Sequence, residues 1–325
     1  MNSDQIFFVV NLKFFLPHIY SMTMEFQRFT FHDIMEDKKS TIEERHQDLI
    51  KLVNYDALEN KRCFIGNKFL YHHQFSNLCK VRGPNKESFF QKMSDDAKYQ
   101  TLWKIMTKLG STGKGRAGSL QSKIFEAYRV NNPVVFFKPT TAKYLYKKYN
   151  AKKVLDPTAG WGGRMIGAWA LGIPYVGFDT NEKMILAYQD MVQDLLDVSD
   201  KLEMDCDISM NFDSCLSADF SQIDYDFVLT SPPYINLEVY EMMPPFESKA
   251  KFYKEFLIPL LQKCLTHIKD PGWVAFNISQ QMYLELLEFG FRACDAEEDL
   301  LQQKRFGKKK EDKIYLWKKK SISLK

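Results

Sequence analysis

The chain has 325 residues, of which 45% are apolar and 26% are charged, a composition typical of a folded globular protein and not of a disordered one. Its length suggests two domains. The formal net charge is only +4, but residues 80–130 carry 11 basic against 4 acidic side chains, residues 181–226 carry 2 against 12, and the tail from Lys304 carries 10 against 2. We expect basic surfaces for a polyanion on both sides of an acidic middle; the alternative is that each cluster is a solvated helix face.

The 6 cysteines form no CxxC pair, so they are expected to be reduced thiols of an intracellular, cytoplasmic protein, with a nuclear location as the alternative. Zinc-ligand spacing is absent, and we predict no metal. The first twenty residues are apolar, but Lys13 and Pro17 interrupt them. The uninterrupted runs are too short to span a bilayer, and a signal peptide is not expected. We therefore predict no membrane association; the sequence indicates no oligomeric state.

In the first part of the chain, Ser40-Thr-Ile-Glu43 fits a helix-capping box, and the apolar positions fit a helix that continues to Leu58. Residues 86–109 are expected to form a second helical stretch. The segment from Gly110 to Ser119 contains four glycines and is expected to be a loop. This loop is either a flexible linker or a mobile segment in which Lys114 and Arg116 bind the phosphates of a nucleic acid.

From residue 120 onward, strands and helices alternate. We expect helices over residues 120–130, 139–149, 163–171, 181–197, 248–268 and 280–289, and strands over 154–155, 175–178, 208–212, 225–230, 273–277, 291–295 and 314–318. Alternation of this kind predicts an α/β fold, a doubly wound and mostly parallel sheet with helices on both faces. The predicted division is a mainly helical N-terminal extension over residues 1–125 and an α/β domain over residues 126–325.

A first motif, Lys-Val-Leu-Asp-Pro-Thr-Ala-Gly-Trp-Gly-Gly-Arg, ends at Arg164. It places a short apolar strand directly before a sharp turn, where Gly160 and Gly162 let the backbone pass close to a ligand. The spacing differs from G-x-G-x-x-G, which disfavours a dinucleotide. Asp179 ends the next strand, where a carboxylate can accept hydrogen bonds from two ribose hydroxyls. Capping of the helix that follows is the alternative role for Asp179.

A second motif, Asp-Phe-Val-Leu-Thr-Ser-Pro-Pro-Tyr, ends at Tyr234. One reaction that such a turn could assist is the methylation of a nucleobase amino group. This exocyclic amino group is a poor nucleophile, because its lone pair is delocalised into the ring. Acceptors such as the Ser231 oxygen and a proline carbonyl favour the pyramidal nitrogen that attacks a methyl group. Pro232 and Pro233 stiffen this geometry, and Tyr234 offers a face on which an extruded base can stack. A rigid turn without catalytic function is the alternative.

Together the two motifs resemble the amino-methyltransferases, which use S-adenosylmethionine (AdoMet) to methylate an exocyclic nitrogen of a nucleobase. The resemblance covers roughly residues 130–320 and implies a Rossmann-like methyltransferase fold with AdoMet as cofactor. It implies that Asp179 binds the ribose and that Asp213 binds the adenine amino group, a role for which Asp219 is the alternative. It also implies that Ser231 to Tyr234 form the catalytic turn. The remaining cofactor residues that it implies are Asp156, near the methionine ammonium, and Phe137, Thr158, Gly160 and Gly162.

The cofactor motif precedes the catalytic motif with no spare segment between them, so target recognition is expected in residues 1–125. In the family, a serine at the first position of the catalytic motif weakly favours N4 of cytosine over N6 of adenine. We therefore predict a DNA amino-methyltransferase. An RNA base methyltransferase and a nucleic-acid-binding subunit with a degenerate site are the alternatives. Methylation of carbon 5 of cytosine is disfavoured because no cysteine follows a proline.

Overall fold

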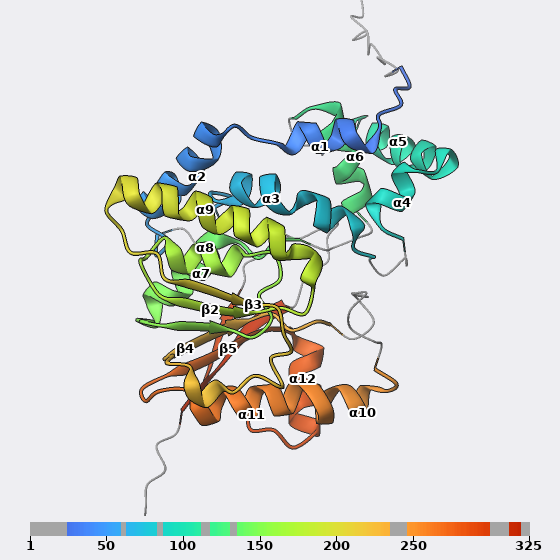
Figure 1. Cartoon of the computed structure of the whole chain (residues 1–325). Helices are drawn as coiled ribbons and strands as arrows, with labels where there is room; N and C mark the ends of the chain where they lie inside the picture. The colour runs from blue at the N-terminus through green and yellow to red at the C-terminus, as the bar shows by residue number, and fades with distance from the viewer. Residues whose placement is uncertain are drawn as a thin grey trace, which may run out of the picture.

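A computed structural model describes residues 25–59, 63–82, 87–111, 118–130, 135–234, 246–299 and 312–319. Lys114 and Arg116 lie outside these ranges, so their assignment to phosphate binding stays a prediction. The described chain folds as a layered α/β structure in which helices lie on both sides of one sheet (Figure 1).

The sheet has seven strands within the described residues, in the order β3-β2-β1-β4-β5-β7-β6. Strands β1 to β5 pair in parallel, and β7 runs antiparallel to both β5 and β6. The strand order turns between β1 and β4, which is where doubly wound sheets bind ligands. The predicted doubly wound, mostly parallel sheet is thus confirmed. The strands are β1 (Val154–Asp156), β2 (Tyr175–Phe178), β3 (Ile208–Asn211), β4 (Phe227–Thr230), β5 (Trp273–Ser279), β6 (Ala296–Asp299) and β7 (Asp312–Lys318).

Two groups of helices cover the sheet because its central strands are apolar on both faces. In β4, the Phe227 and Leu229 side chains join one hydrophobic cluster and Val228 joins the other. The first face carries α7 (Pro139–Lys148), α8 (Gly163–Trp169) and, after the short helix η1 (Glu182–Met184), α9 (Ile185–Leu202). The second face carries α10 (Lys249–Lys251), the π-helical η3 (Phe252–Leu257), α11 (Ile258–His267) and α12 (Gln280–Glu288), and η2 (Phe220–Gln222) precedes β4 (Figure 1).

The described part of the N-terminal extension is helical, as predicted, and it packs outside α9 (Figure 1). One hydrophobic cluster runs from Ile34 in the extension through Met191 in α9 to Leu316 in the sheet. The predicted boundary at residue 125 falls inside a helix, and the division into two domains stays a prediction. The helices are α1 (Phe31–Lys38), α2 (Ile42–Asn54), α3 (Asn67–Lys80), α4 (Phe89–Met93), α5 (Asp96–Ser111) and α6 (Leu120–Arg129).

Several predicted boundaries in the extension were wrong. The capping box begins at Thr41, not Ser40, because the Thr41 hydroxyl accepts from the Glu44 N–H and the Glu44 carboxylate accepts from the Thr41 N–H, both at 3.1 Å. Helix α2 ends at Asn54, before Leu58. The helical stretch expected over 86–109 consists of two helices, α4 and α5. Outside the extension, near the chain end, β6 occupies 296–299 and not the predicted 291–295.

Candidate active site

The two sequence motifs meet at the carboxyl edge of the sheet. Strands β1 and β4 are neighbours, with Leu155 opposite Val228, so the turns that follow them leave the sheet side by side. The Thr158 and Thr230 hydroxyl oxygens lie 2.6 Å apart and share a hydrogen bond. The proposed cofactor turn and the proposed catalytic turn are therefore joined directly, although they are 72 residues apart in sequence.

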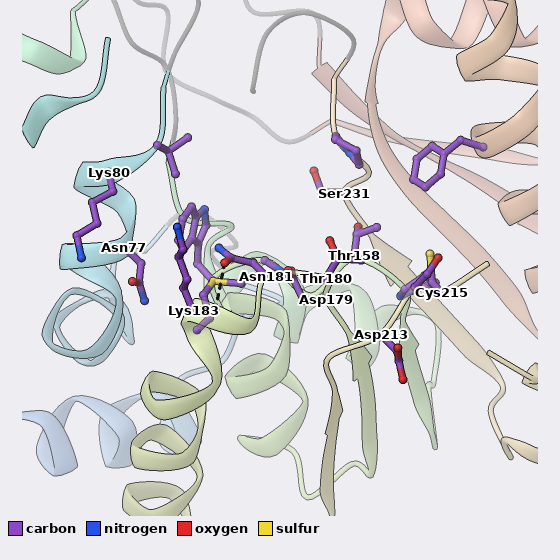
Figure 2. Close-up of a pocket in the computed structure, with 18 of the residues that line it drawn as sticks. Asn77, Lys80, Thr158, Asp179, Thr180, Asn181, Lys183, Asp213, Cys215 and Ser231 are labelled. Carbon is purple, nitrogen blue, oxygen red and sulfur yellow. Dashed lines mark hydrogen bonds between the residues drawn. The ribbon is translucent and has the colours of Figure 1, made fainter. Parts of the chain in front are cut away.

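A cavity of about 410 Å³ opens at this edge, within the range of small-molecule sites (Figure 2). Six residues predicted from the sequence line it: Thr158, Gly160, Asp179, Asp213, Ser231 and Pro233. The other predicted residues within the described chain lie outside its lining: Phe137, Asp156, Gly162, Pro232 and Tyr234. Figure 2 shows Ser231 and Thr158 on one side of the cavity, Asp179 in the middle, and Asn77 and Lys80 from the extension on the other side.

Asp179 holds the glycine turn from the end of β2. One of its carboxylate oxygens accepts from the Gly160 N–H and the other from the Asn181 N–H, each at 2.9 Å. Burial raises the pKa of the Asp179 carboxyl to about 6, although both hydrogen bonds oppose the shift. The helix that follows is capped by the Asn181 side chain, so the capping alternative is not the main role of Asp179. Its remaining lone pairs are available to the cavity that it lines.

Two glycines of the first motif serve packing as well as the turn. Gly162 has a positive φ of 81°, and a Cβ there would lie 2.6 Å from the Met191 side chain of α9. A Cβ on Gly163 would lie 2.0 Å from the Phe137 carbonyl oxygen. The glycine turn at the start of α8 therefore packs directly against α9 and against the segment before α7. This explains the Gly-Gly pair without a ligand contact from Gly162.

Asp156 lies behind the turn. Its side chain is fully buried, and one carboxylate oxygen accepts from Arg164 Nε at 2.6 Å and from the Tyr175 hydroxyl at 2.7 Å. Arg164 also donates to the Thr158 carbonyl, and its guanidinium lies 5.2 Å from the centre of the Phe137 ring. This arrangement gives Asp156 and Phe137 a part in shaping the turn. Their implied contacts with the methionine end of a cofactor stay predictions.

Ser231 has a neighbour that the sequence did not indicate. The Ser231 hydroxyl oxygen accepts a hydrogen bond from Asn277 Nδ2, on β5, at 3.1 Å. Asn277 is only 9% exposed, and its Oδ1 atom has no hydrogen-bond partner within the described structure. A buried amide oxygen without a partner is costly, so this atom is a candidate acceptor for a ligand bound near Ser231.

Aromatic side chains line the cavity near the proposed catalytic turn. Phe246 and Phe256 contribute to its wall, with ring centroids 5.9 Å apart. Tyr234 is half-buried and packs with the same apolar cluster. Stacking of a base on Tyr234 stays a prediction, and Phe246 and Phe256 are further candidates. Both follow the motif at a distance and belong to no recognisable pattern, so sequence reasoning missed them.

The loop after β3 also lines the cavity. Asp213 lines the cavity beside Cys215, whereas Asp219 does not and instead caps η2 by accepting from the Ser221 N–H at 3.0 Å. The geometry therefore favours Asp213 over its competitor. Burial raises the pKa of the Cys215 thiol to about 12, so it is protonated at neutral pH and is no nucleophile. Lys263 fixes this loop by donating to the Cys215 carbonyl at 3.0 Å and to the Leu216 carbonyl at 2.8 Å.

The extension completes the cavity. Asn77, Lys80, Val81 and Arg82, at the end of α3 and just beyond it, are among the lining residues. The sequence had one signal for them, because Lys80 and Arg82 begin the basic stretch of residues 80–130. It gave no indication that these two cations line the same cavity as the glycine turn.

A second cluster of charged groups fixes the extension to α9. Donor atoms of His46, Asp194 and Asp197 lie within 4.8 Å of one another, a spacing compatible with a metal ion. Both Asp194 oxygens, however, are bound by the Arg45 guanidinium, and His73 Nε2 lies 2.9 Å from one of them. Because the guanidinium already neutralises the carboxylate, we interpret the cluster as an ion-pair network. In the described chain, no helix combines the length and apolarity needed to cross a membrane.

No family model matches the sequence, and no curated protein matches it either. A putative class I S-adenosylmethionine-dependent methyltransferase from Listeria monocytogenes is similar over 87% of this chain and 90% of its own, with 12% identity and a TM-score of 0.41. An RNA methyltransferase from Salinibacter ruber, in complex with S-adenosyl-L-homocysteine, is similar over 59% and 98%, with 14% identity and a TM-score of 0.37. TrmN from Thermus thermophilus is similar over 56% of this chain and 48% of its own, with 17% identity and a TM-score of 0.36, so the match spans about half of that protein.

Proposed function

We propose that this protein transfers a methyl group from AdoMet to the exocyclic amino group of a base in DNA, with N4 of cytosine favoured over N6 of adenine. One observation carries the proposal: a single cavity extends from Asp179 and Gly160 to Ser231 and Pro233. A methyl donor held by Asp179 and Gly160 and an amino group held by Ser231 and Pro233 would lie in the same cavity.

The lining residues fit AdoMet by their chemistry. Asp179 would supply a partly buried carboxylate for the ribose hydroxyls, and Asp213 lies on the loop that would border the adenine. The Thr158–Gly160 turn lies between them and the catalytic turn and would accommodate the methionine part. When bound, AdoMet supplies a methyl group that its sulfonium centre already activates. The protein therefore needs no covalent nucleophile, which agrees with the protonated Cys215 thiol.

The turn from Ser231 to Tyr234 would supply the acceptors that the reaction needs. The Ser231 oxygen and the Pro232 carbonyl would accept hydrogen bonds from the target N–H groups and hold the nitrogen toward the methyl donor. Asn277 orients Ser231 through its hydrogen bond at 3.1 Å. Phe246 and Phe256 offer apolar surface on which an extruded base would stack.

The decisive experiment uses AdoMet with a labelled methyl group. The protein is incubated with separate DNA and RNA pools, and the labelled nucleoside is identified by mass spectrometry. We expect label on an exocyclic amino nitrogen of DNA, and we expect Ser231→Ala to lose the transfer while it keeps AdoMet binding by calorimetry. Label on a base of RNA alone would move the substrate to RNA. Label on a ring carbon, or none in a protein that binds AdoMet, would overturn the assignment.

A further inference from the structure

Two cations of the extension stand at the cavity without a counter-charge. Lys80 and Arg82 are both exposed and both line the cavity, and neither forms an ion pair with a described residue. Most other cations in the described part of the extension are paired with acids: Arg28, Lys38, Lys39, Arg45, Lys68, Lys92 and Lys98. The pair at the cavity therefore keeps its positive charge available for a ligand.

These cations are held in place by the anchoring of α3. His73 Nε2 lies 2.9 Å from the Asp194 carboxylate, and Gln74 Nε2 donates to Met191 Sδ at 3.5 Å. Both contacts join α3 to α9, whose first turns follow directly on Asp179 and η1. Lys80 therefore stands at a fixed place relative to the glycine turn, and Figure 2 shows it across the cavity from Asp213 and Cys215.

The electrostatics divide the cavity in two. Its inner wall carries the acids Asp179 and Asp213, and its extension side carries Lys80 and Arg82, with Lys183 nearby on η1. The carboxylate of AdoMet would need one cation, whereas Lys80 and Arg82 together place two on the extension side of the cavity. Lys80 and Arg82 are separated by one residue in the sequence. A lysine and an arginine at this spacing suit the repeated phosphates of a polynucleotide, because an arginine can bind a phosphate in a bidentate way.

We propose that Lys80 and Arg82 bind backbone phosphates that flank the base entering the cavity. The inference rests on the proposed function, and it specifies a polynucleotide strand, not a free base or nucleoside, as the substrate. It also gives α3 a role in substrate binding: its end would hold the strand while the base reaches Ser231. Phosphate contacts of this kind fix position and register but carry no base information.

The test measures binding to a DNA oligonucleotide over a range of salt concentrations, without turnover. Wild type is compared with Lys80→Ala/Arg82→Ala and with a control, Lys51→Ala/Lys104→Ala. The control removes two exposed extension lysines that do not line the cavity. The log–log slope is about −0.9 per neutralised phosphate on duplex DNA and about −0.7 on single strands. We expect the first variant to flatten the slope by up to about two units and the control to leave it unchanged. AdoMet affinity, measured by calorimetry, should be equal in all three.

The outcomes separate this proposal from the methyl transfer itself. An unchanged salt slope in Lys80→Ala/Arg82→Ala, in a variant that melts like wild type, would overturn the phosphate role even if wild type methylates DNA. A loss of AdoMet affinity with an unchanged slope would assign the two cations to the cofactor carboxylate instead. An equal flattening in the control would show a diffuse charge effect and also reject the site. A flattened slope in a protein that transfers no methyl group would support the phosphate site and reject the proposed reaction.

Discussion

The Asp179 carboxylate connects the glycine turn to the cavity, and its ionisation is shifted by burial. Its pKa is about 6, above its ordinary value of 3.8. Folding therefore favours the protonated form, and this contribution to stability is complete below the ordinary value and is lost as the pH rises through about 6. Ribose hydroxyls that donate to Asp179 would favour the ionised form instead. We expect AdoMet affinity to fall as the pH drops below about 6 and to be constant above it.

Titration calorimetry across the acidic and neutral range checks this, with Asp179→Asn as the control. The amide keeps the volume and one acceptor but cannot titrate. A hydrogen bond to a charged group is worth about 1.5–3 kcal/mol, so affinity at neutral pH should fall roughly tenfold or more. The pH dependence should disappear. If it persists in the variant, another group controls cofactor binding.

Asn277 is the second residue with a specific expected effect. Asn277→Ala removes the 3.1 Å hydrogen bond that orients the Ser231 hydroxyl. A neutral hydrogen bond contributes about 0.5–1.5 kcal/mol, so kcat should fall roughly twofold to tenfold while the AdoMet dissociation constant stays unchanged. Because Asn277 acts through Ser231, the double variant Ser231→Ala/Asn277→Ala should be no slower than Ser231→Ala alone. An additional loss in the double variant would mean that Asn277 acts independently.

Local pattern placed two of the candidate residues at the cavity, and their roles there stay predictions. Asp179 and Ser231 each end a short apolar strand, and parallel strands bring their carboxyl ends to one edge, so both were expected at a site and both line the cavity. Asp156 also ends a strand, but its side chain turns away because Arg164 and Tyr175 bind it. Those contacts depend on how α8 and β2 pack around β1, and the spacing of the motif does not encode them.

At the scale of elements, α3 was missed by sequence reasoning for a physical reason. Its N-terminal cap is Gly66, which has a positive φ of 87° and forms no side-chain cap. Its buried side chains, Phe69, Leu70, Gln74, Phe75, Leu78 and Cys79, surround much of the helix because α3 packs both on α9 and on other helices of the extension. Neither a cap nor a single apolar stripe marked the helix. The residues that α3 contributes to the cavity were missed with it.

The attachment of α2 and α3 to α9 depends on one carboxylate. Burial alone would raise the pKa of Asp194, but hydrogen bonds from His73, Arg45 and His46 hold it well below its ordinary value. The stabilisation is therefore complete at neutral pH and is lost only in strong acid. Asp194→Asn leaves the Arg45 charge without its partner, and loss of one member of a buried pair costs about 3–5 kcal/mol.

Chemical denaturation and hydrogen exchange in α2 and α3 measure this effect. Asp197→Asn is the matched control, because Asp197 is exposed on the same helix one turn later. It should change the free energy of unfolding by no more than about 0.5 kcal/mol. Equal, small effects of the two variants would show that apolar packing alone holds the extension in place.

At the scale of the whole molecule, the extension and the sheet share one core. Ile34, Leu70 and Met191 belong to a single buried cluster, and the buried Lys143 amine of α7 donates to the Leu52 and Val53 carbonyls of α2 at 2.7 Å. We expect residues 126–325, expressed alone, to aggregate or to melt far below the full chain, because apolar surface on α8 and α9 becomes exposed. Circular dichroism and size-exclusion chromatography check this. A monodisperse fragment that binds AdoMet would instead establish two independent domains.

The hydroxyl pair between Thr158 and Thr230 has a consequence for how this molecule can vary. The two hydroxyls share a hydrogen bond at 2.6 Å. Replacing either threonine by an apolar residue would therefore leave the other hydroxyl without this partner. We therefore expect the residues at these two positions to vary together. A chimera that takes its glycine turn from one homologue and its strand β4 from another will keep the reaction geometry only where both parents provide compatible side chains at this one point of contact.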